Sequence, residues 1–284
     1  MAARLLQVVV LAAAAGTGAV AAVPDTAEMN KPHKPFKILG NTYYVGTAGI
    51  TSLLVTSEYG HVLLDTGLAD SAPLIAKNIE ELGFELGDVK AILFSHPHPD
   101  HVGGIAELQR LTGAQVYGLR AAESVLRTGK LARDDPMYGV RGNPIPKVER
   151  SWVVTDGQLL GVGSIRLRVH ATPGHTPASA TWTWDACEGS KCLAFVYADS
   201  LNPSGADKYK FKDHPETVQA FQSSLALIES LPCELLMTGH HDAATLARLE
   251  AAKGDADALK DEAACKRFAQ QRREALQKRL AEEG

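Results

Sequence analysis

The segment from His96 to His101, His-Pro-His-Pro-Asp-His, places three imidazoles and one carboxylate within six residues. These side chains are common zinc ligands. His96 and His98 alternate on an extended stretch, so both can point to one side and bind one ion. Asp100 and His101 follow on a turn and can face a second ion. A merely polar, His-rich loop is the weaker interpretation, because this string has few chance origins.

Two further histidines follow predicted strands directly. His175 lies in the turn 172–177, where one glycine and two prolines restrict the backbone. His240 follows the apolar run 235–237, and His241 is the alternative at that position. Two ions with three protein ligands each would leave positions open for water, which is the catalytic pattern.

The remaining polar candidates are weaker. Asp65 ends a predicted strand and could accept a hydrogen bond from the outer nitrogen of a ligand histidine, or simply cap a turn. His170 is either a partner of His175 or a core residue. We expect His33 and His214 to be solvated and His61 to be structural.

The hydrophobic pattern predicts an α/β fold with two face-to-face β-sheets and outer helices in one domain. The metal segment then follows a buried strand, where open α/β sheets place their chemistry. Residues 128–149 are rich in Gly, Pro and charge and predict an irregular surface excursion. We expect strands at 36–39, 42–45, 52–56, 61–64, 91–94, 116–117, 152–154, 165–171, 180–184, 193–198 and 234–237, and helices at 73–82, 105–111, 121–127, 215–231 and within 255–283.

Residues 1–22 predict a signal peptide. Arg4 supplies the positive charge, an apolar, Ala-rich stretch follows, and Ala19-Val20-Ala21 offers small residues for cleavage. An uncleaved membrane anchor is the alternative. We therefore expect a mature domain over 23–284 that is periplasmic or secreted, with no membrane contact after cleavage.

The four cysteines are Cys187, Cys192, Cys233 and Cys265. An even number in an exported chain predicts two disulfides, for which three connectivities exist. The short spacing of Cys187 and Cys192 fits a hairpin end, so the economical pairing joins them and leaves Cys233 with Cys265. Zinc binding by the thiols is the alternative, but their spacing forms no recognised four-ligand pattern.

The composition suits a globular protein, with 45% hydrophobic and 22% charged residues. The net charge of −4 makes nucleic acid a poor partner, because nucleic-acid binding needs a basic surface. A nuclease that acts on DNA or RNA is disfavoured for the same reason.

Together these motifs resemble the metallo-β-lactamase superfamily, and within it the third subclass (B3) of the class B β-lactamases. The resemblance covers the chain from about Phe36 to its end. It implies a four-layer αββα sandwich of two mixed sheets. It is carried by residues 63–67, 95–101, the His175 turn, 197–201 and 233–240.

The resemblance also implies two Zn²⁺ ions per chain. One would be bound by His96, His98 and His175, and the other by Asp100, His101 and His240. Asp100 would also orient a hydroxide or move a proton. Ser200, which stands where relatives have a cysteine ligand, would hold water or the substrate carboxylate. We expect that carboxylate to lie near Ser200 and Asn202.

The implied activity is an exported zinc β-lactamase that opens penicillins, cephalosporins and carbapenems through a hydroxide held by both zincs. The alternatives are a lactonase or a glyoxalase-II-like thioesterase, since such relatives use a bridging aspartate in a segment similar to that of Asp199. A non-catalytic zinc-binding module is disfavoured because all six ligands are intact. We expect a small β-lactam as the only partner, and a monomer.

Overall fold

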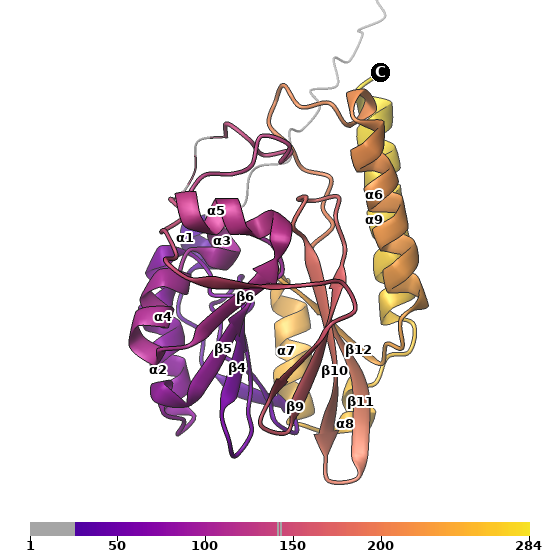
Figure 1. Ribbon diagram of the computed structural model, residues 1–284. Coiled ribbons are helices and arrows are strands. Elements are labelled where there is room, and N and C mark those ends of the chain that lie inside the picture. Colours follow the sequence, from indigo (N-terminus) through magenta and orange to yellow (C-terminus); the bar gives the residue numbers. More distant parts are fainter. Residues whose placement is uncertain (1–25, 141, 143) are drawn as a thin grey trace, which may run out of the picture.

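The computed structural model describes residues 26–140, 142 and 144–284, so the signal peptide expected at 1–22 lies outside the described residues. Two β-sheets face each other, and helices cover both outer faces (Figure 1). This confirms the predicted αββα sandwich.

The first sheet is antiparallel at its start and parallel at its end. Short connections without helices join β1 to β4, whereas helical crossovers join β4 to β7, as antiparallel and parallel pairs allow. Its seven strands lie in chain order: β1 (Phe36–Leu39), β2 (Thr42–Tyr44), β3 (Leu53–Val55), β4 (His61–Leu64), β5 (Val89–Leu93), β6 (Gln115–Leu119) and β7 (Ser151–Val154).

The second sheet has five strands in the order β12-β11-β10-β9-β8. All its pairs are antiparallel except β11 with β12, which the long helix α6 connects. Its strands are β8 (Leu159–Val162), β9 (Ile165–Ala171), β10 (Ala180–Glu188), β11 (Lys191–Ala198) and β12 (Leu235–Thr238).

Two sets of helices complete the outer layers. Helices α2 (Ala72–Glu81), α4 (Ile105–Thr112) and α5 (Glu123–Thr128) cover the first sheet, while α6 (Pro215–Ser230) and α9 (Ala264–Glu282) cover the second. The shorter helices are α1 (Thr26–Met29), α3 (Pro99–Val102), α7 (Ala243–Ala252) and α8 (Ala256–Leu259), with single 3₁₀ turns at Ala69–Ser71, Leu86–Asp88, Arg120–Ala122 and Phe211–Asp213.

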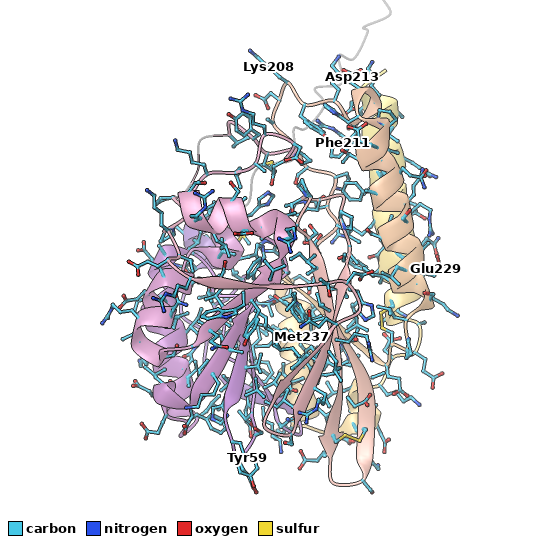
Figure 2. All side chains as sticks on the ribbon, viewed as in Figure 1. Tyr59, Lys208, Phe211, Asp213, Glu229 and Met237 are labelled. Atoms are coloured by element: carbon cyan, nitrogen blue, oxygen red, sulfur yellow. A yellow bond between two sulfur atoms is a disulfide. The ribbon has the colours of Figure 1, made fainter. Side chains whose placement is uncertain are left out.

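The central core lies between the sheets. Trp182 and Tyr197 are fully buried there, and Met237 stands at its middle in Figure 2, in contrast to the exposed Tyr59 at one tip. Leu246 from α7 also packs into this layer, so α7 closes one side of the sandwich. Burial of this apolar surface is the main force that holds the two sheets together.

Several elements differ from the expectation, including the short helices α1 and α3, which were not predicted. Strand β8 was not predicted, because its Leu-Leu-Gly-Val run is short and contains glycine. Helix α7 was also missed, although Asp242 caps it by accepting a hydrogen bond from Thr245 N at 2.7 Å, a recognisable start signal. The single helix expected in the tail is broken into α8 and α9.

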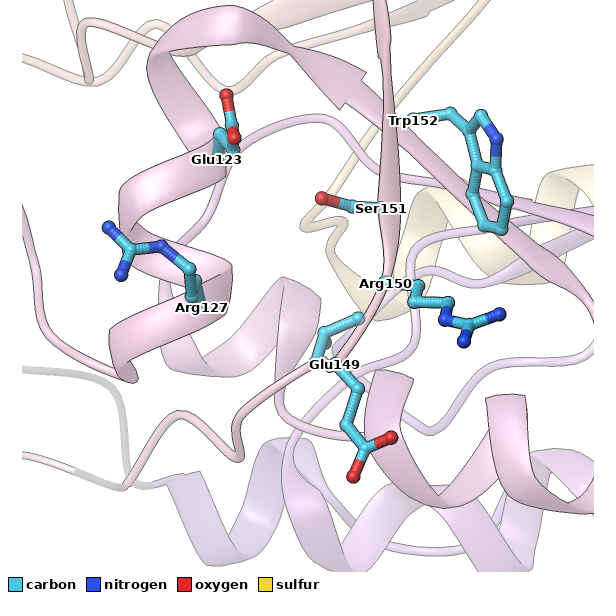
Figure 3. A pocket seen from close by; sticks show the side chains of 7 residues that line it. Glu123, Arg127, Glu149, Arg150, Ser151 and Trp152 are labelled. Atoms are coloured by element: carbon cyan, nitrogen blue, oxygen red, sulfur yellow. The ribbon is translucent and has the colours of Figure 1, made fainter.

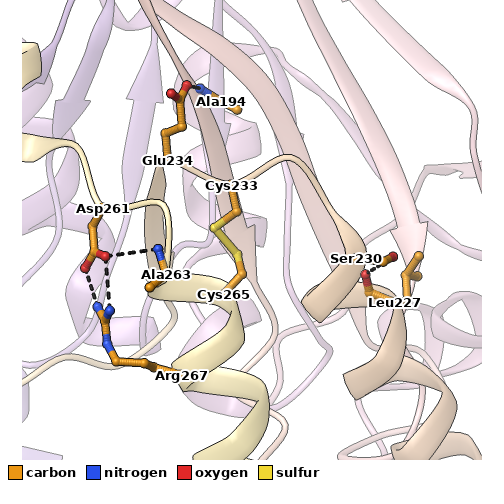
Figure 4. The surroundings of a disulfide bond; sticks show 9 residues. All are labelled: Ala194, Leu227, Ser230, Cys233, Glu234, Asp261, Ala263, Cys265 and Arg267. Atoms are coloured by element: carbon orange, nitrogen blue, oxygen red, sulfur yellow. Dashed lines mark hydrogen bonds and ion pairs between the residues drawn. A yellow bond between two sulfur atoms is a disulfide. The ribbon is translucent and has the colours of Figure 1, made fainter.

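Both predicted disulfides are present. Cys187 and Cys192 face each other across the β10–β11 pair. Cys233 and Cys265 join the segment before β12 to the start of α9 (Figure 4). Arg267 on that helix pairs with Asp261, so the same end of α9 is held twice. Within the described residues, no helix is both long and apolar enough to cross a membrane.

Removing the Cys233–Cys265 bond should lower the free energy of unfolding by about 2–4 kcal/mol, because it closes the longer loop. Removing Cys187–Cys192 should cost less, since its sequence separation is only 5 residues against 32. Denaturant unfolding of the two double Cys→Ser variants measures this. Equal losses would contradict the loop-length argument.

Candidate metal centre

Three strand ends from both sheets converge on one place. His96 and His98 follow β5 of the first sheet. His175 follows β9 and His240 follows β12, both of the second sheet. The candidate ligands are therefore brought together only when the two sheets pack face to face.

The first group consists of His96, His98 and His175. Their ligand nitrogens all lie within 4.8 Å of one another. The Nε2 atoms of His96 and His175 are 3.2 Å apart, and all three rings are buried. This geometry can hold one metal ion.

The second group consists of Asp100, His101 and His240. His240 Nε2 lies 3.1 Å from His101 Nε2 and 3.0 Å from Asp100 Oδ2. His101 is fully buried, whereas the side chains of Asp100 and His240 are 31% and 34% exposed, so solvent reaches the site from this side. The ligand atoms of His96, Asp100 and His101 also lie within 4.8 Å, so the two groups adjoin.

Asp65 anchors the second group, as the sequence suggested. Its Oδ2 accepts hydrogen bonds from His101 Nδ1 at 2.8 Å, Tyr197 Oη at 2.7 Å and Ser95 Oγ at 2.7 Å. Its Oδ1 accepts from Ser95 N at 2.6 Å. Asp65 is fully buried and has a φ of 56°, in the left-handed region that aspartate tolerates better than most residues. These contacts hold His101 with Nε2 facing the site.

The outer nitrogens of the first group also face acceptors. His175 Nδ1 donates to Asn202 O at 2.7 Å. Asp199 Oδ1 lies 2.8 Å from His96 Nδ1, and both carboxylate oxygens of Asp135 lie 3.2 Å from His98 Nε2. Each ring is thereby held with its other nitrogen toward the site.

Asp135 is a functional candidate that the sequence analysis missed. It lies in the expected 128–149 excursion, yet it is 1% exposed. Its Oδ1 also accepts from Met137 N at 2.8 Å, which fixes the local turn. An acidic residue in a polar loop gives no periodic signal, so only its burial identifies it.

The protonation states of the two groups differ. Burial lowers the pKa of His96 and His175 well below the usual range, so both rings are neutral. Burial alone would raise the pKa of Asp100, but His101 and His240 hold it well below its ordinary value. Burial would likewise lower the pKa of His101, but Asp100 and Asp65 raise it to about 10.

The other histidines lie outside the cluster. His241 turns away from it, with Nε2 2.7 Å from Tyr44 Oη, so the geometry favours His240 as the ligand. His170 Nε2 is 3.0 Å from Thr183 Oγ1 on the neighbouring strand, and it is therefore structural. His33 was expected to be solvated, but its ring packs 5.7 Å from that of Tyr44.

The expected substrate residues lie beside the first group. Ser200 is 6% exposed, and Asn202 is exposed while its carbonyl oxygen holds His175. The loops after α5 and β11 rise at the same end of the sandwich in Figure 1. They meet where Ala206 N donates to Pro136 O at 2.8 Å.

A separate hollow of about 300 Å³ lies between α5 and β7. Its lining includes Glu123, Arg127, Glu149 and Arg150 and none of the candidate ligands. Figure 3 shows these four charged side chains pointing in different directions, so they do not converge on one ligand.

Comparison with known proteins agrees with this geometry. Residues 45–188 match a family model described as the metallo-beta-lactamase superfamily. The chain belongs to this superfamily. The crystal structure of the metallo-beta-lactamase SMB-1 with mercaptoacetic acid is 41% identical, has a TM-score of 0.85, and covers 90% of this chain and 99% of that chain.

Two further relatives define its neighbourhood within the superfamily. MEM-A1, a subclass B3 metallo-beta-lactamase from a soil metagenome library, is 41% identical with a TM-score of 0.86, covering 90% of this chain and 98% of that chain. The hydroxyacylglutathione hydrolase of Cereibacter sphaeroides is 28% identical over 210 residues, 71% of this chain and 69% of its own length. The protein is thus a hydrolase of the metallo-beta-lactamase superfamily, and the predicted B3 resemblance is confirmed.

The Asp65→Asn variant should bind zinc roughly 10–100-fold more weakly. Asparagine tolerates the same backbone conformation. Its side-chain NH2 group is a donor, however, and every partner of Asp65 at this site is also a donor. Competition with a chromophoric chelator measures the affinity, and the exposed Asp70→Asn is the matched control. Affinities that agree within twofold would contradict the anchoring role of Asp65.

Proposed function

We propose that this chain is an exported β-lactamase that uses two zinc ions to open the lactam ring of penicillins, cephalosporins and carbapenems. The observation that carries the proposal is the pair of adjoining three-residue groups, in a chain whose sequence is 41% identical to those of SMB-1 and MEM-A1. The signal peptide expected at 1–22 and the two disulfides suit an oxidising compartment.

The donor set fits two divalent cations. His96 and His175 are both neutral, so each ring offers one unprotonated nitrogen. His175 Nδ1 donates its proton to Asn202 O, which leaves its Nε2 free, and the Nε2 atoms of His175 and His96 lie 3.2 Å apart, close enough to bind one cation together. His101 Nε2 and His240 Nε2 lie 3.1 Å apart beside the ionised carboxylate of Asp100, and a cation bound there would take the place of the His101 proton.

Bound zinc supplies a water of pKa about 7 and polarises a carbonyl oxygen, which is the chemistry that amide hydrolysis needs. The protein residues add orientation and proton transfer. Asp100 stays ionised and partly exposed, so it can accept a proton from water and deliver it to the amide nitrogen. Ser200 and Asn202 would bind the substrate carboxylate at the edge of the first group.

The hydroxyacylglutathione hydrolase relative supports a second candidate, a glyoxalase-II-like thioesterase. That function would need Asp199 to bridge the metals. Here Asp199 is fully buried behind His96, at its outer nitrogen, and Oδ2 accepts from Leu201 N at 3.0 Å. This placement favours the β-lactamase.

The deciding experiment is a substrate panel with the purified protein. We expect zinc-dependent hydrolysis of a penicillin, a cephalosporin and a carbapenem, lost with a chelator and recovered with zinc. A hydroxyacylglutathione thioester and a homoserine lactone should react far more slowly. Thioester or lactone rates well above the lactam rates would refute the proposal.

Replacing His98 with alanine should reduce lactam turnover at least a hundredfold, because it removes one of three donors from the first group. His170→Ala is the control, since that histidine lies on β9 outside the cluster and should retain parental turnover. Equal activity of both variants would show that the cluster is not the catalytic centre.

Zinc binding to the second group should strengthen with pH. The pKa of His101 is raised to about 10 in the metal-free protein, so zinc must displace a proton at neutral pH. Between pH 6.5 and 8.5 the affinity of this group should rise roughly tenfold per unit, the slope for one proton. Zinc titration of the His98→Ala variant measures this, and a flat profile would contradict it.

A further inference from the structure

The contact between Tyr44 and His241 lies beside the proposed site but outside its chemistry. Tyr44 stands on β2 and is fully buried. Its hydroxyl is 2.7 Å from His241 Nε2 and 3.1 Å from Ile50 O, and it also bonds Thr47 O. One oxygen atom thus joins the loop 46–51 to the residue that follows His240.

The number of protons defines the direction of these bonds. The Tyr44 hydroxyl has a single proton, and two carbonyl oxygens of the loop can only accept it. The contact with His241 must therefore use a proton from His241, whose Nε2 donates to Tyr44 Oη. The tyrosine is donor to the loop and acceptor from the histidine at once.

The loop in turn holds His240. Ile50 forms an antiparallel bridge with His240, and Thr51 N donates to Gly239 O at 2.9 Å. The outer nitrogen of His240, Nδ1, lies 3.4 Å from Gly49 O. His240 is the more exposed histidine of its group, so the loop restrains it on the side opposite to the contacts of Nε2 with Asp100 and His101.

The loop 46–51, Gly239 and His101 are closely packed. A Cβ atom on Gly239 would lie 2.3 Å from His101 Cε1, and one on Gly46 would lie 2.4 Å from Ile50 O. A small shift of the loop is therefore transmitted to the distance between His101 and His240. The rings of the first group have separate partners in Asp199, Asp135 and Asn202.

We propose that Tyr44 and His241 form a clamp that positions His240 and thereby sets the metal affinity of the Asp100/His101/His240 group, leaving the first group unchanged. The clamp residues touch neither metal nor substrate; they act through the loop 46–51. This inference rests on the proposed metal site.

The test measures zinc dissociation constants by chelator competition in two backgrounds. In His98→Ala, where the second group alone is intact, Tyr44→Phe should weaken binding about tenfold or more. In His240→Ala, where the first group alone is intact, the same change should leave binding unaltered. A merely structural role of Tyr44 would weaken both backgrounds alike.

Variants at His241 and a control complete the design. His241→Gln keeps an N–H donor near the Nε2 position and should recover most of the affinity that His241→Leu loses. Because His241 acts through the Tyr44 hydroxyl, Tyr44→Phe combined with His241→Leu should lose little more than Tyr44→Phe alone. Tyr43→Phe, on the same strand but packed against Phe84, should bind zinc as the parent does.

The outcomes separate two failures. A parent that binds no zinc refutes the proposed function. A parent that binds zinc, with Tyr44→Phe and His241→Leu both unchanged in the His98→Ala background, refutes the clamp alone. If Tyr44→Phe does not fold, His241→Leu removes the same hydrogen bond without altering β2, and its zinc affinity decides.

Discussion

The site depends on histidine rings that are turned so that their ligand nitrogens face one another. In the first group the Nε2 atoms of His96 and His175 lie 3.2 Å apart, and the outer nitrogen of each ring lies within 2.8 Å of an oxygen. Those oxygens select the tautomer and the ring orientation together. The site is therefore prepared by the oxygens that lie behind the rings, and the nitrogens in front are placed to bind a divalent cation.

The fold delivers these oxygens from places far apart in the chain. Asp65 follows β4, Asp199 follows β11, and Asp135 comes from the long excursion after α5. Each is at most 1% exposed, although burying a carboxylate is costly. That cost is offset only because every one of them faces a histidine ring or backbone donors, which explains why loops as well as strands must be accurately placed.

The sequence allowed prediction of the sandwich, most strands, both disulfides and all six clustered residues, because each carries a local pattern: apolar runs, cysteine spacing or dense histidine motifs. It did not allow prediction of Asp135, which depends on where a loop folds back. Nor could it separate the roles of His240 and His241, adjacent residues that the structure turns in opposite directions. The role of Asp199 could not be predicted either, because it depends on which side of the His96 ring the carboxylate lies.

The clustered ligands come from both sheets. On the proposed function, a bound cation therefore also cross-links the two sheets. A ligand that binds only the folded state shifts the folding equilibrium by mass action. When zinc is scarce the protein would lose this cross-link, and separation of the two sheets would expose the chain to proteases. Scarcity of the metal would then shorten the lifetime of the protein as well as abolish its activity.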